Sequence, residues 1–513
     1  MLVSKTAVEE FRARKLRDWR YLKAKARKRV YRAVKTYLPE GFKFKTKPLL
    51  CQLVGLYLGL RLGEFIYMYE MGLGKTKILL DLISILKIRG KVTRTLLVAE
   101  NLVNMYNLEE QVQLHSNLTC KVVDGPIVDR TDLLLNAKYD ILIVNYAGLV
   151  LAMCDRVESN RKNRKTQYVV NKKRVRRLSK NIDLIALDEI QNVKNRETLA
   201  FRIINVLSKG VNHRFGATGT PIGADPADFW AEFYLIDRGN TLGQTLTLYR
   251  ALFFKERKNP WSQFPEFVFD DSKRGLLNTT IQNRSLSYED SEVHDLPTMH
   301  IIDVPIGLGE DARRYYKMVM KEAYHKERDF LGIKNIFTKA RQVASSFLIT
   351  EYGVLEFDYN GKIEWLVSAV KEFPVDDKFV VFHSFKYSGR AIASALKKAR
   401  VKVVCLNGAT KDKKKVLSQF KRNPKVKGMV VNTDSGSSGL NLQAANRVVY
   451  YETPVSVIKF MQSMKRCRRA GQTKRVYTYF LLAKNTLEAK RVQLLREGKD
   501  MVDEVVRGKE KLV

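Results

Sequence analysis

The stretch FIYMYEMGLGKTKILLDLISIL, residues 65–86, decides the fold of the first half of the chain. An apolar run (65–69) is followed by a glycine-rich turn (70–76) and then by a helical pattern. A strand, a glycine-rich turn and a helix in this order are the context in which loops bind phosphate groups. We therefore expect an α/β domain with an anion site at the positive end of this helix.

The glycine-rich turn offers a set of groups that suits a nucleotide. Gly72 and Gly74 would let the backbone curl until its N–H groups face the phosphates. Lys75 would reach the β- and γ-phosphates, and Thr76 would place its hydroxyl on Mg²⁺. Tyr69 stands where the general GxxxxGKT pattern has its first glycine. The predicted nucleotide-binding residues of the turn are Glu70, Met71, Gly72, Leu73, Gly74, Lys75 and Thr76.

An acidic pair follows a second apolar run, in DLIALDEIQ, residues 183–191. Ligands bind at the carboxyl ends of the strands in an open parallel sheet, and Asp188 and Glu189 come at such an end. Asp188 would hold Mg²⁺, and Glu189 would orient and deprotonate the attacking water. A solvent-exposed acidic turn is the alternative interpretation.

Short apolar runs alternate with helical patterns through most of the chain, which predicts βαβ units and parallel sheets. The first set of strands is 95–99, 140–146 and 183–188, with helices over 76–88 and 104–114. A second α/β lobe is predicted from strands at 300–306, 379–385, 401–406, 428–433, 447–452 and 475–482. The segment between the lobes, 237–299, is aromatic and has few clear strands.

We divide the chain accordingly into five parts. A basic N-terminal helical arm (1–46) precedes the first lobe (47–236), and a helical protrusion and linker (237–299) joins it to the second lobe (300–495). A basic tail (496–513) ends the chain. The arm contains a helix predicted over residues 7–37.

The charge balance is unusual for a globular chain of 513 residues. The 92 Lys and Arg residues exceed the 54 Asp and Glu residues by 38, and this excess must lie mostly on the surface. Such a surface attracts polyanions, above all a nucleic-acid backbone. The alternatives are a basic but unrelated enzyme, or a protein that binds ribosomes or membrane surfaces.

Cysteine usage and the terminal sequence favour a reducing compartment. The five cysteines are scattered and never spaced as CxxC, which argues against a zinc cluster or a disulfide framework. The N-terminus lacks the apolar core of a secretory signal, and no apolar stretch is long enough to span a bilayer. We expect a soluble intracellular protein that does not bind membranes.

Two basic segments have two interpretations each. The helix predicted over 7–37 either packs on the first lobe as a solvated helix or contacts nucleic acid. The insertion at 159–180 is either a surface loop or a nucleic-acid contact. The sequence leaves both choices open.

Two arginines in the second lobe suit a transferring phosphoryl group. The segment VSVIKFMQSMKRCRRAGQ, 455–472, is predicted to be helical until Gly471, so that Arg466 and Arg469 share one face. Two guanidinium groups aimed together can act as arginine fingers. The alternative is a basic helix face that binds only a phosphate backbone.

These residues together resemble the Swi/Snf-type branch of the superfamily 2 helicase-like ATPases, over residues 47–490. KPLLCQLVGLYLG (47–59) resembles the adenine-side segment, with Gln52 as its glutamine, and EMGLGKT resembles motif I. LDEIQ resembles motif II with Gln191 as its last residue, and ATGTPI resembles motif III. The motif III residues are Thr218, Gly219 and Thr220.

The resemblance continues in the second half. NTDSGSSGLNLQAANRVVYYE, 432–452, resembles motif V, and QSMKRCRRAGQ, 462–472, resembles motif VI. Three residues depart from the family pattern. Glu100 and Asn101 replace the usual start of motif Ia, and Arg468 stands where motif VI usually has His. The matching residues are Gly436, Gly439 and Asn441 in motif V and Gln462, Arg466, Arg469 and Gln472 in motif VI.

The resemblance implies two tandem RecA-like lobes that hydrolyse ATP with Mg²⁺ and move along DNA. Thr218, Gly219, Thr220, Asn441 and Gln462 would then couple the nucleotide state to DNA, and Gly439 would contact the nucleotide. We expect a monomer that binds the backbone of duplex or branched DNA, with RNA as an alternative substrate.

The resemblance also sets the biological context. A compact viral or bacterial member is expected in the cytoplasm or nucleoid, or in the nucleus of a eukaryotic cell, with a partner from replication, recombination or transcription. Two other hypotheses are a motor that remodels a polymerase–nucleic-acid complex and an ATP-gated binding module without turnover.

Overall fold

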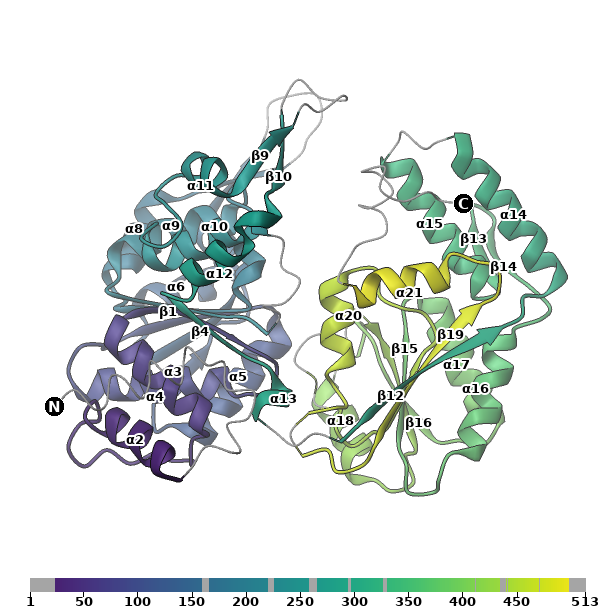
Figure 1. Ribbon diagram of the computed structural model, residues 1–513, viewed down its shortest axis with the longest axis horizontal. Helices are drawn as coiled ribbons and strands as arrows, with labels where there is room; N and C mark the ends of the chain where they lie inside the picture. The colour runs from purple at the N-terminus through teal and green to yellow at the C-terminus, as the bar shows by residue number, and fades with distance from the viewer. Residues whose placement is uncertain are drawn as a thin grey trace. The chain divides into compact units, whose positions relative to one another are not determined.

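The structure is a computed structural model whose chain divides into two compact units, Met1–His294 and Asp295–Val513 (Figure 1). The two units are described separately below as unit 1 and unit 2. The described residues are 24–158, 166–219, 226–257, 265–293, 297–325, 330–410, 412–433, 440, 442–469 and 471–497.

Unit 1 is built around a parallel sheet of seven strands in the order β11-β1-β8-β7-β2-β4-β3. In β1, Phe65 and Tyr67 join one apolar core, whereas Ile66 and Met68 join the other. Burial on both faces explains why these strands form continuous apolar runs. The strands are β1 (Glu64–Tyr69), β2 (Thr95–Ala99), β3 (Cys120–Val122), β4 (Ile141–Asn145), β7 (Leu184–Asp188), β8 (His213–Ala217) and β11 (Ser285–Tyr288).

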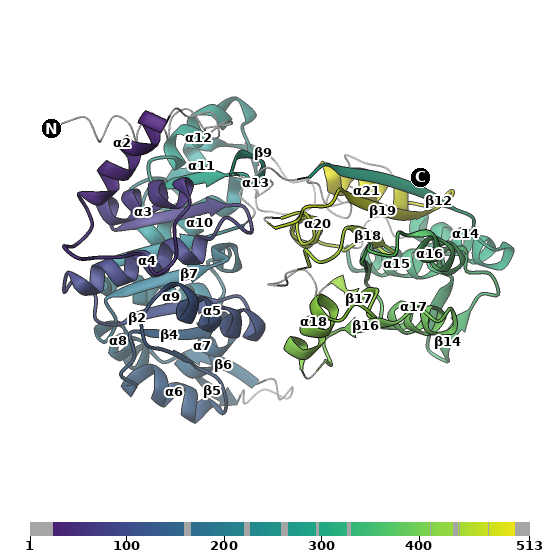
Figure 2. The same ribbon diagram turned by 90° about the horizontal axis from the view of Figure 1, so that it is seen from below.

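Helices cover both faces of this sheet (Figures 1 and 2). One face carries α2 (Ala24–Lys35), α3 (Leu50–Leu62), α4 (Lys75–Ile88) and α5 (Leu102–His115), whose apolar residues belong to a single core. The other helical elements of the unit are α6 (Ile127–Asn136), α7 (Tyr146–Met153), α8 (Lys172–Lys180), η2 (Ile190–Val193), α9 (Leu199–Gly210), α10 (Pro226–Asp237), α11 (Leu246–Phe253), η3 (Asp271–Lys273), α12 (Arg274–Ile281) and α13 (Asp290–Val293). The α6–α12 region contributes most of the second core.

Unit 1 contains two antiparallel hairpins outside this sheet. The first, β5 (Cys154–Glu158) with β6 (Thr166–Val170), leads into α8, so the described part of the 159–180 insertion is a strand and a helix rather than a loop. The second hairpin, β9 (Phe254–Arg257) with β10 (Glu266–Phe269), lies in the segment predicted to be a helical protrusion. Strand β11 from the same segment pairs with β1, and unit 1 therefore continues to His294.

Unit 2 has a parallel sheet of six strands in the order β12-β19-β18-β15-β17-β16. In β15, Val380 and Phe382 point into one core and Phe379 and Val381 into another. The strands are β12 (Met299–Ile306), β15 (Phe379–His383), β16 (Val403–Leu406), β17 (Gly428–Asn432), β18 (Arg447–Tyr450) and β19 (Val476–Ala483). The predicted class of two tandem RecA-like parallel-sheet lobes is thus confirmed.

The helices of unit 2 lie on both sides of its sheet. They are α14 (Glu310–His325), α15 (Phe330–Ala344), α16 (Gly361–Glu372), α17 (Lys386–Lys398), α18 (Lys413–Arg422), α20 (Val457–Met464) and α21 (Glu488–Arg496). Helices α14 and α15 form a core of their own with the hairpin β13 (Phe347–Thr350) and β14 (Gly353–Glu356). No helix within the described ranges is both long and apolar enough to cross a membrane.

Part of the predicted N-terminal helix can be compared with the structure. Helix α2 covers Ala24–Lys35 and buries Val30 and Val34, while Lys28, Arg29 and Arg32 remain exposed. Residues 1–23 lie outside the described residues, as do most of the predicted C-terminal tail and residues 159–165 of the insertion.

Candidate nucleotide-binding site

The predicted site residues of unit 1 lie at one edge of its sheet. Strands β1, β8 and β7 are consecutive neighbours and run parallel. The phosphate loop follows β1, Thr218 follows β8, and Asp188 is the last residue of β7. The three carboxyl ends therefore bring these groups to one edge, where open parallel sheets bind ligands.

The phosphate loop has the backbone that the sequence predicts. Gly72 and Gly74 have φ values of 97° and 73°, in the left-handed region that glycine adopts at little cost. Gly74 is the N-cap of α4, and Lys75 begins that helix. The buried Lys75 Nζ donates to the carbonyls of Tyr69 at 2.9 Å and Glu70 at 3.4 Å. Its ammonium group is thus held beside the loop that would wrap the phosphates.

Gln52, which the family resemblance implied, supports this loop directly. Its Nε2 donates to the carbonyl of Leu73 at 3.0 Å, and its Oε1 accepts from the N–H of Leu49 at 2.9 Å. A Cβ atom on Gly74 would lie only 2.3 Å from Gln52 Nε2. The glycine is therefore required both for its φ angle and for the space that the glutamine fills.

Glu189 is buried and held in a fixed orientation beside the loop. Its backbone has a φ of 48°, a left-handed conformation that a residue with a Cβ rarely adopts. Its Oε2 accepts from Gln191 Nε2 at 2.7 Å and from the N–H of Gly219 at 3.2 Å. A Cβ atom on Gly219 would lie 3.3 Å from Lys75 Nζ and 3.4 Å from Glu189 Oε1. Lys75 and Glu189 therefore both lie close to Gly219.

The two adjacent carboxyl groups place strong negative charge at this edge. Burial, with a further contribution from Glu189, raises the pKa of Asp188 to about 7, and Lys75 opposes this shift. A bound cation would relieve the same repulsion, and the hydroxyl of Thr76 is an oxygen ligand of the kind that Mg²⁺ prefers. Within the described residues, however, no cluster of three or more His, Cys, Asp or Glu side chains could hold a metal ion alone. The phosphates of a nucleotide would have to complete the coordination.

Gln191 offers a further group to a ligand. Its Oε1 is buried and has no hydrogen-bond partner within the described part of the chain, although its Nε2 is bonded to Glu189. A buried acceptor of this kind requires a donor. A water molecule beside Glu189 could supply one.

Sequence reasoning missed Tyr146, which supports the acidic pair from a neighbouring part of the sheet. Its buried hydroxyl donates to the backbone carbonyl of Asp188 at 2.8 Å. Burial, with the nearby carboxylates of Asp188 and Glu189, raises the pKa of Tyr146 well above its ordinary value, so the phenol stays a donor. The signal was present in DILIVNY, because Tyr146 follows the end of β4 at the same sheet edge.

The motif VI arginines do not lie on a helix, and this prediction is wrong. Helix α20 ends at Met464, and Arg466 and Arg469 follow in a turn. The helix stops because later carbonyls bond elsewhere: that of Arg466 accepts from the N–H of Leu442, and that of Cys467 accepts from Gln472 Nε2. We call residues 465–469 the arginine loop.

The structure gives each arginine a different environment within unit 2. Arg466 is 3 % exposed and its Nη1 lies 3.4 Å from the carbonyl oxygen of Leu440, whereas Arg469 is half-buried. Gln462 is buried on α20. Thr218 is buried at the edge in unit 1, and the predicted residues Thr220, Gly436, Gly439 and Asn441 lie outside the described residues.

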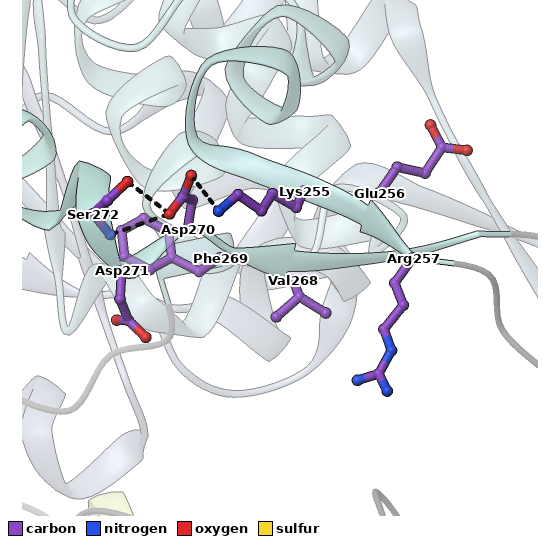
Figure 3. Close-up of a pocket in the computed structure, with 8 residues that line it drawn as sticks. All are labelled: Lys255, Glu256, Arg257, Val268, Phe269, Asp270, Asp271 and Ser272. Carbon is purple, nitrogen blue, oxygen red and sulfur yellow. Dashed lines mark hydrogen bonds and ion pairs between the residues drawn. The ribbon is translucent and has the colours of Figure 1, made fainter.

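A hollow of about 480 Å³ lies on the β9–β10 hairpin, away from this edge, and Figure 3 shows its lining residues. Within it, Asp270 accepts from Lys255 at 3.1 Å and from the N–H of Ser272 at 3.1 Å. It contains none of the predicted site residues and has no glycine loop. The sheet edge, not this hollow, is the candidate site.

Comparison with known families now gives this geometry a context. Residues 62–350 match the family described as SNF2-related domain, and residues 361–471 match the helicase conserved C-terminal domain. The chain belongs to the SNF2-related family. The first match includes the phosphate loop and the acidic pair, and the second includes the arginine loop.

Individual relatives are distant. The Uncharacterized ATP-dependent helicase MG018 of Mycoplasma genitalium is 24 % identical over 331 residues, which cover 63 % of this chain and 30 % of that protein. A relative in Invertebrate iridescent virus 6, also named as a helicase, is 24 % identical over 64 % of this chain and 62 % of its own length. The chain thus spans less than two thirds of either relative.

A solved structure is also similar to the chain. The SWI2/SNF2 ATPase core of Sulfolobus solfataricus, determined in complex with dsDNA, is 23 % identical, covers 92 % of this chain and 95 % of that chain, and has a TM-score of 0.42.

Proposed function

We propose that this chain is a DNA-dependent ATPase that uses ATP hydrolysis to translocate along, or remodel, DNA without reading its sequence. The observation that carries the proposal is that Lys75, Glu189 and Gly219 lie close together at the carboxyl edge of the unit 1 sheet. A bound γ-phosphate would lie beside these groups. Membership of the SNF2-related family supports an ATP-hydrolysing role for them.

The residues of unit 1 each have a defined task in this proposal. Lys75 would exchange the loop carbonyls that it now contacts for the β- and γ-phosphate oxygens. Thr76 and Asp188 would hold Mg²⁺, which when bound would neutralise charge developing on the phosphates. Glu189, oriented by Gln191 and Gly219, would take a proton from the attacking water.

The acceptor Oε1 of Gln191 would orient that water toward the phosphate. Arg466 and Arg469 would supply positive charge to the transition state from unit 2, as arginine fingers do. Gly219 belongs to the motif III segment, and its N–H donates to Glu189. Loss of the γ-phosphate would therefore change the contacts of that segment directly.

Charge on the surface supports a nucleic-acid backbone as the polymer along which the chain moves. The net charge is +38, and helix α8 exposes a group of cations and no acidic residue. These cations are Lys172, Lys173, Arg176, Arg177 and Lys180. Contacts from such side chains to phosphates fix position without reading bases. Binding should therefore weaken steeply as salt concentration rises.

The test is steady-state ATP turnover by the full chain with and without nucleic acid. We expect duplex DNA to raise kcat about tenfold or more, and Lys75→Ala to abolish turnover with every substrate. Lys91→Ala, an exposed lysine of the same unit, is the control for lost charge. Comparing single strands, duplex, forks, four-way junctions and RNA would identify the substrate. Turnover that persists in Lys75→Ala would refute the assignment.

A further inference from the structure

Arg468 makes a contact that the proposed function does not use. Its Nε donates to the carbonyl of Pro297 at 2.9 Å. Arg468 lies in the arginine loop, between Arg466 and Arg469, and its side chain is half-buried. Pro297 is the first described residue of unit 2, directly after residues 294–296 that connect it to unit 1 in sequence.

The acceptor carbonyl occupies a particular position in the chain. The next carbonyl, that of Thr298, already accepts from the N–H of Val476 at 3.1 Å, where the β12–β19 ladder begins. Ladder hydrogen bonds therefore fix the chain from Thr298 onward. Arg468 bonds to the residue just before the ladder. It therefore fixes the chain at a residue that precedes the first hydrogen bond of the sheet.

Other hydrogen bonds hold the arginine loop to the body of unit 2. The carbonyl of Arg466 accepts from Leu442, and Gln472 donates to the carbonyl of Cys467 at 3.2 Å. The Cys467 side chain is buried in the core of the unit. These contacts bind the loop to the body of unit 2, and the Arg468 contact binds the same loop to the chain that enters the unit.

We propose that Arg468 is a positioning residue for ATP hydrolysis, which fastens the loop carrying Arg466 and Arg469 to the entry of the chain into unit 2. The direction in which the chain enters and the placement of the two arginines are then linked by one hydrogen bond. This inference rests on the proposed function, because it needs Arg466 and Arg469 to act on the transferring phosphoryl group.

The test compares Arg468→Met with a matched variant, Arg496→Met, in the full chain. Arg496 also fastens strand β12, through bonds to Asp303 at 2.5 and 3.0 Å, but it lies on α21 rather than in the arginine loop. We expect Arg468→Met to lower kcat about tenfold with an unchanged KM for ATP, because small displacements of a catalytic group are costly. Arg496→Met should keep the kcat of the wild type.

Two further variants separate positioning from a loss of fold. Arg468→Gln carries its Nε2 donor at the same position along the side chain as the arginine Nε and should recover most of kcat, whereas Arg468→Leu has no donor and should behave like Arg468→Met. Thermal unfolding of all four variants should stay near that of the wild type. If Arg468→Met does not fold, Arg468→Gln against Arg468→Leu gives the same comparison.

The decisive arm is a combined variant. If Arg468 acts through Arg466 and Arg469, adding Arg468→Met to a variant that carries both Arg466→Ala and Arg469→Ala should cause no further loss of kcat. Independent losses that multiply would overturn the proposal, and so would equal kcat values for Arg468→Met and Arg496→Met. A wild-type chain without ATP turnover would instead refute the proposed function itself.

Discussion

The carboxyl edge of the unit 1 sheet and the arginine loop of unit 2 contribute to the proposed reaction in different ways. At the edge, Lys75, Glu189 and Gly219 already lie close together, and Gln52 and Tyr146 hold the supporting backbone. In the arginine loop, each arginine has its own surroundings, and no phosphate-binding glycine turn accompanies them in the described part of unit 2. We propose that unit 1 binds the nucleotide through its phosphate loop and that unit 2 contributes Arg466 and Arg469 to the reaction.

The largest effect that this comparison predicts is on the chemical step at the edge. Glu189→Gln keeps an acceptor for the N–H of Gly219 but removes the group that takes a proton, so kcat should fall about a thousandfold. ATP binding should be unchanged, because Lys75 and the loop remain intact. Turnover assays and nucleotide titration measure the two effects. Glu197→Gln, an exposed glutamate on the loop that follows, should match the wild type.

A smaller effect is expected on binding alone. Gly74→Ala forces a left-handed backbone, which costs about 1–2 kcal/mol, and drives the new Cβ toward Gln52 Nε2. We expect ATP binding to weaken by about thirtyfold, since about 1.4 kcal/mol corresponds to a factor of ten. Gly90→Ala is the matched control: its φ is 66°, and no heavy atom lies within 4 Å of an added Cβ. Equal ATP affinities in the two variants would show that the loop does not require the glycine.

The smallest effect concerns stability and pH. Burial, with Asp228 adding to it, raises the pKa of Glu232 from 4.5 to about 8. The folded state therefore binds this proton more tightly than the unfolded state, and stability is lost as pH rises through this window. Glu232→Gln imitates the protonated form, so it should be neutral at pH 5 and stabilising at pH 9.

The size of that effect can be measured by thermal unfolding. If Glu232→Gln raises the free energy of unfolding by only about 1 kcal/mol, Tm at pH 9 should rise by roughly 2–4 °C. A Tm difference that does not change between pH 5 and pH 9 would mean that Glu232 is not buried in its neutral form. Either result leaves the nucleotide edge intact, because Glu232 lies on α10 rather than at a strand end.

The fold and the edge were predictable where local sequence determines them. Strand β2 begins and ends where the run TLLVA does, and EMGLGKT and DEIQ have the predicted positions at strand ends. Strand β11 was not predicted, because its pairing with β1 joins residues distant in sequence. Tyr146 was missed for a related reason, since its role depends on strand β7, which is separated from β4 by β2 in the sheet.

The helix predicted around the motif VI arginines failed because of competition for its carbonyls. Periodicity continues past Met464, but Leu442 and Gln472 take the carbonyls of Arg466 and Cys467. Such partners lie elsewhere in the fold and leave no signal within the segment itself. The residue types of the arginine loop could thus be predicted from the sequence, whereas its conformation could not.

The most direct test of the division between the units is Arg469→Ala in the full chain, measured both for ATP affinity and for single-turnover hydrolysis on duplex DNA. We predict an ATP Kd within about twofold of the wild type and a hydrolysis rate reduced about a thousandfold, as loss of an arginine finger requires. A hydrolysis rate equal to that of the wild type, or a loss confined to Kd, would contradict the account.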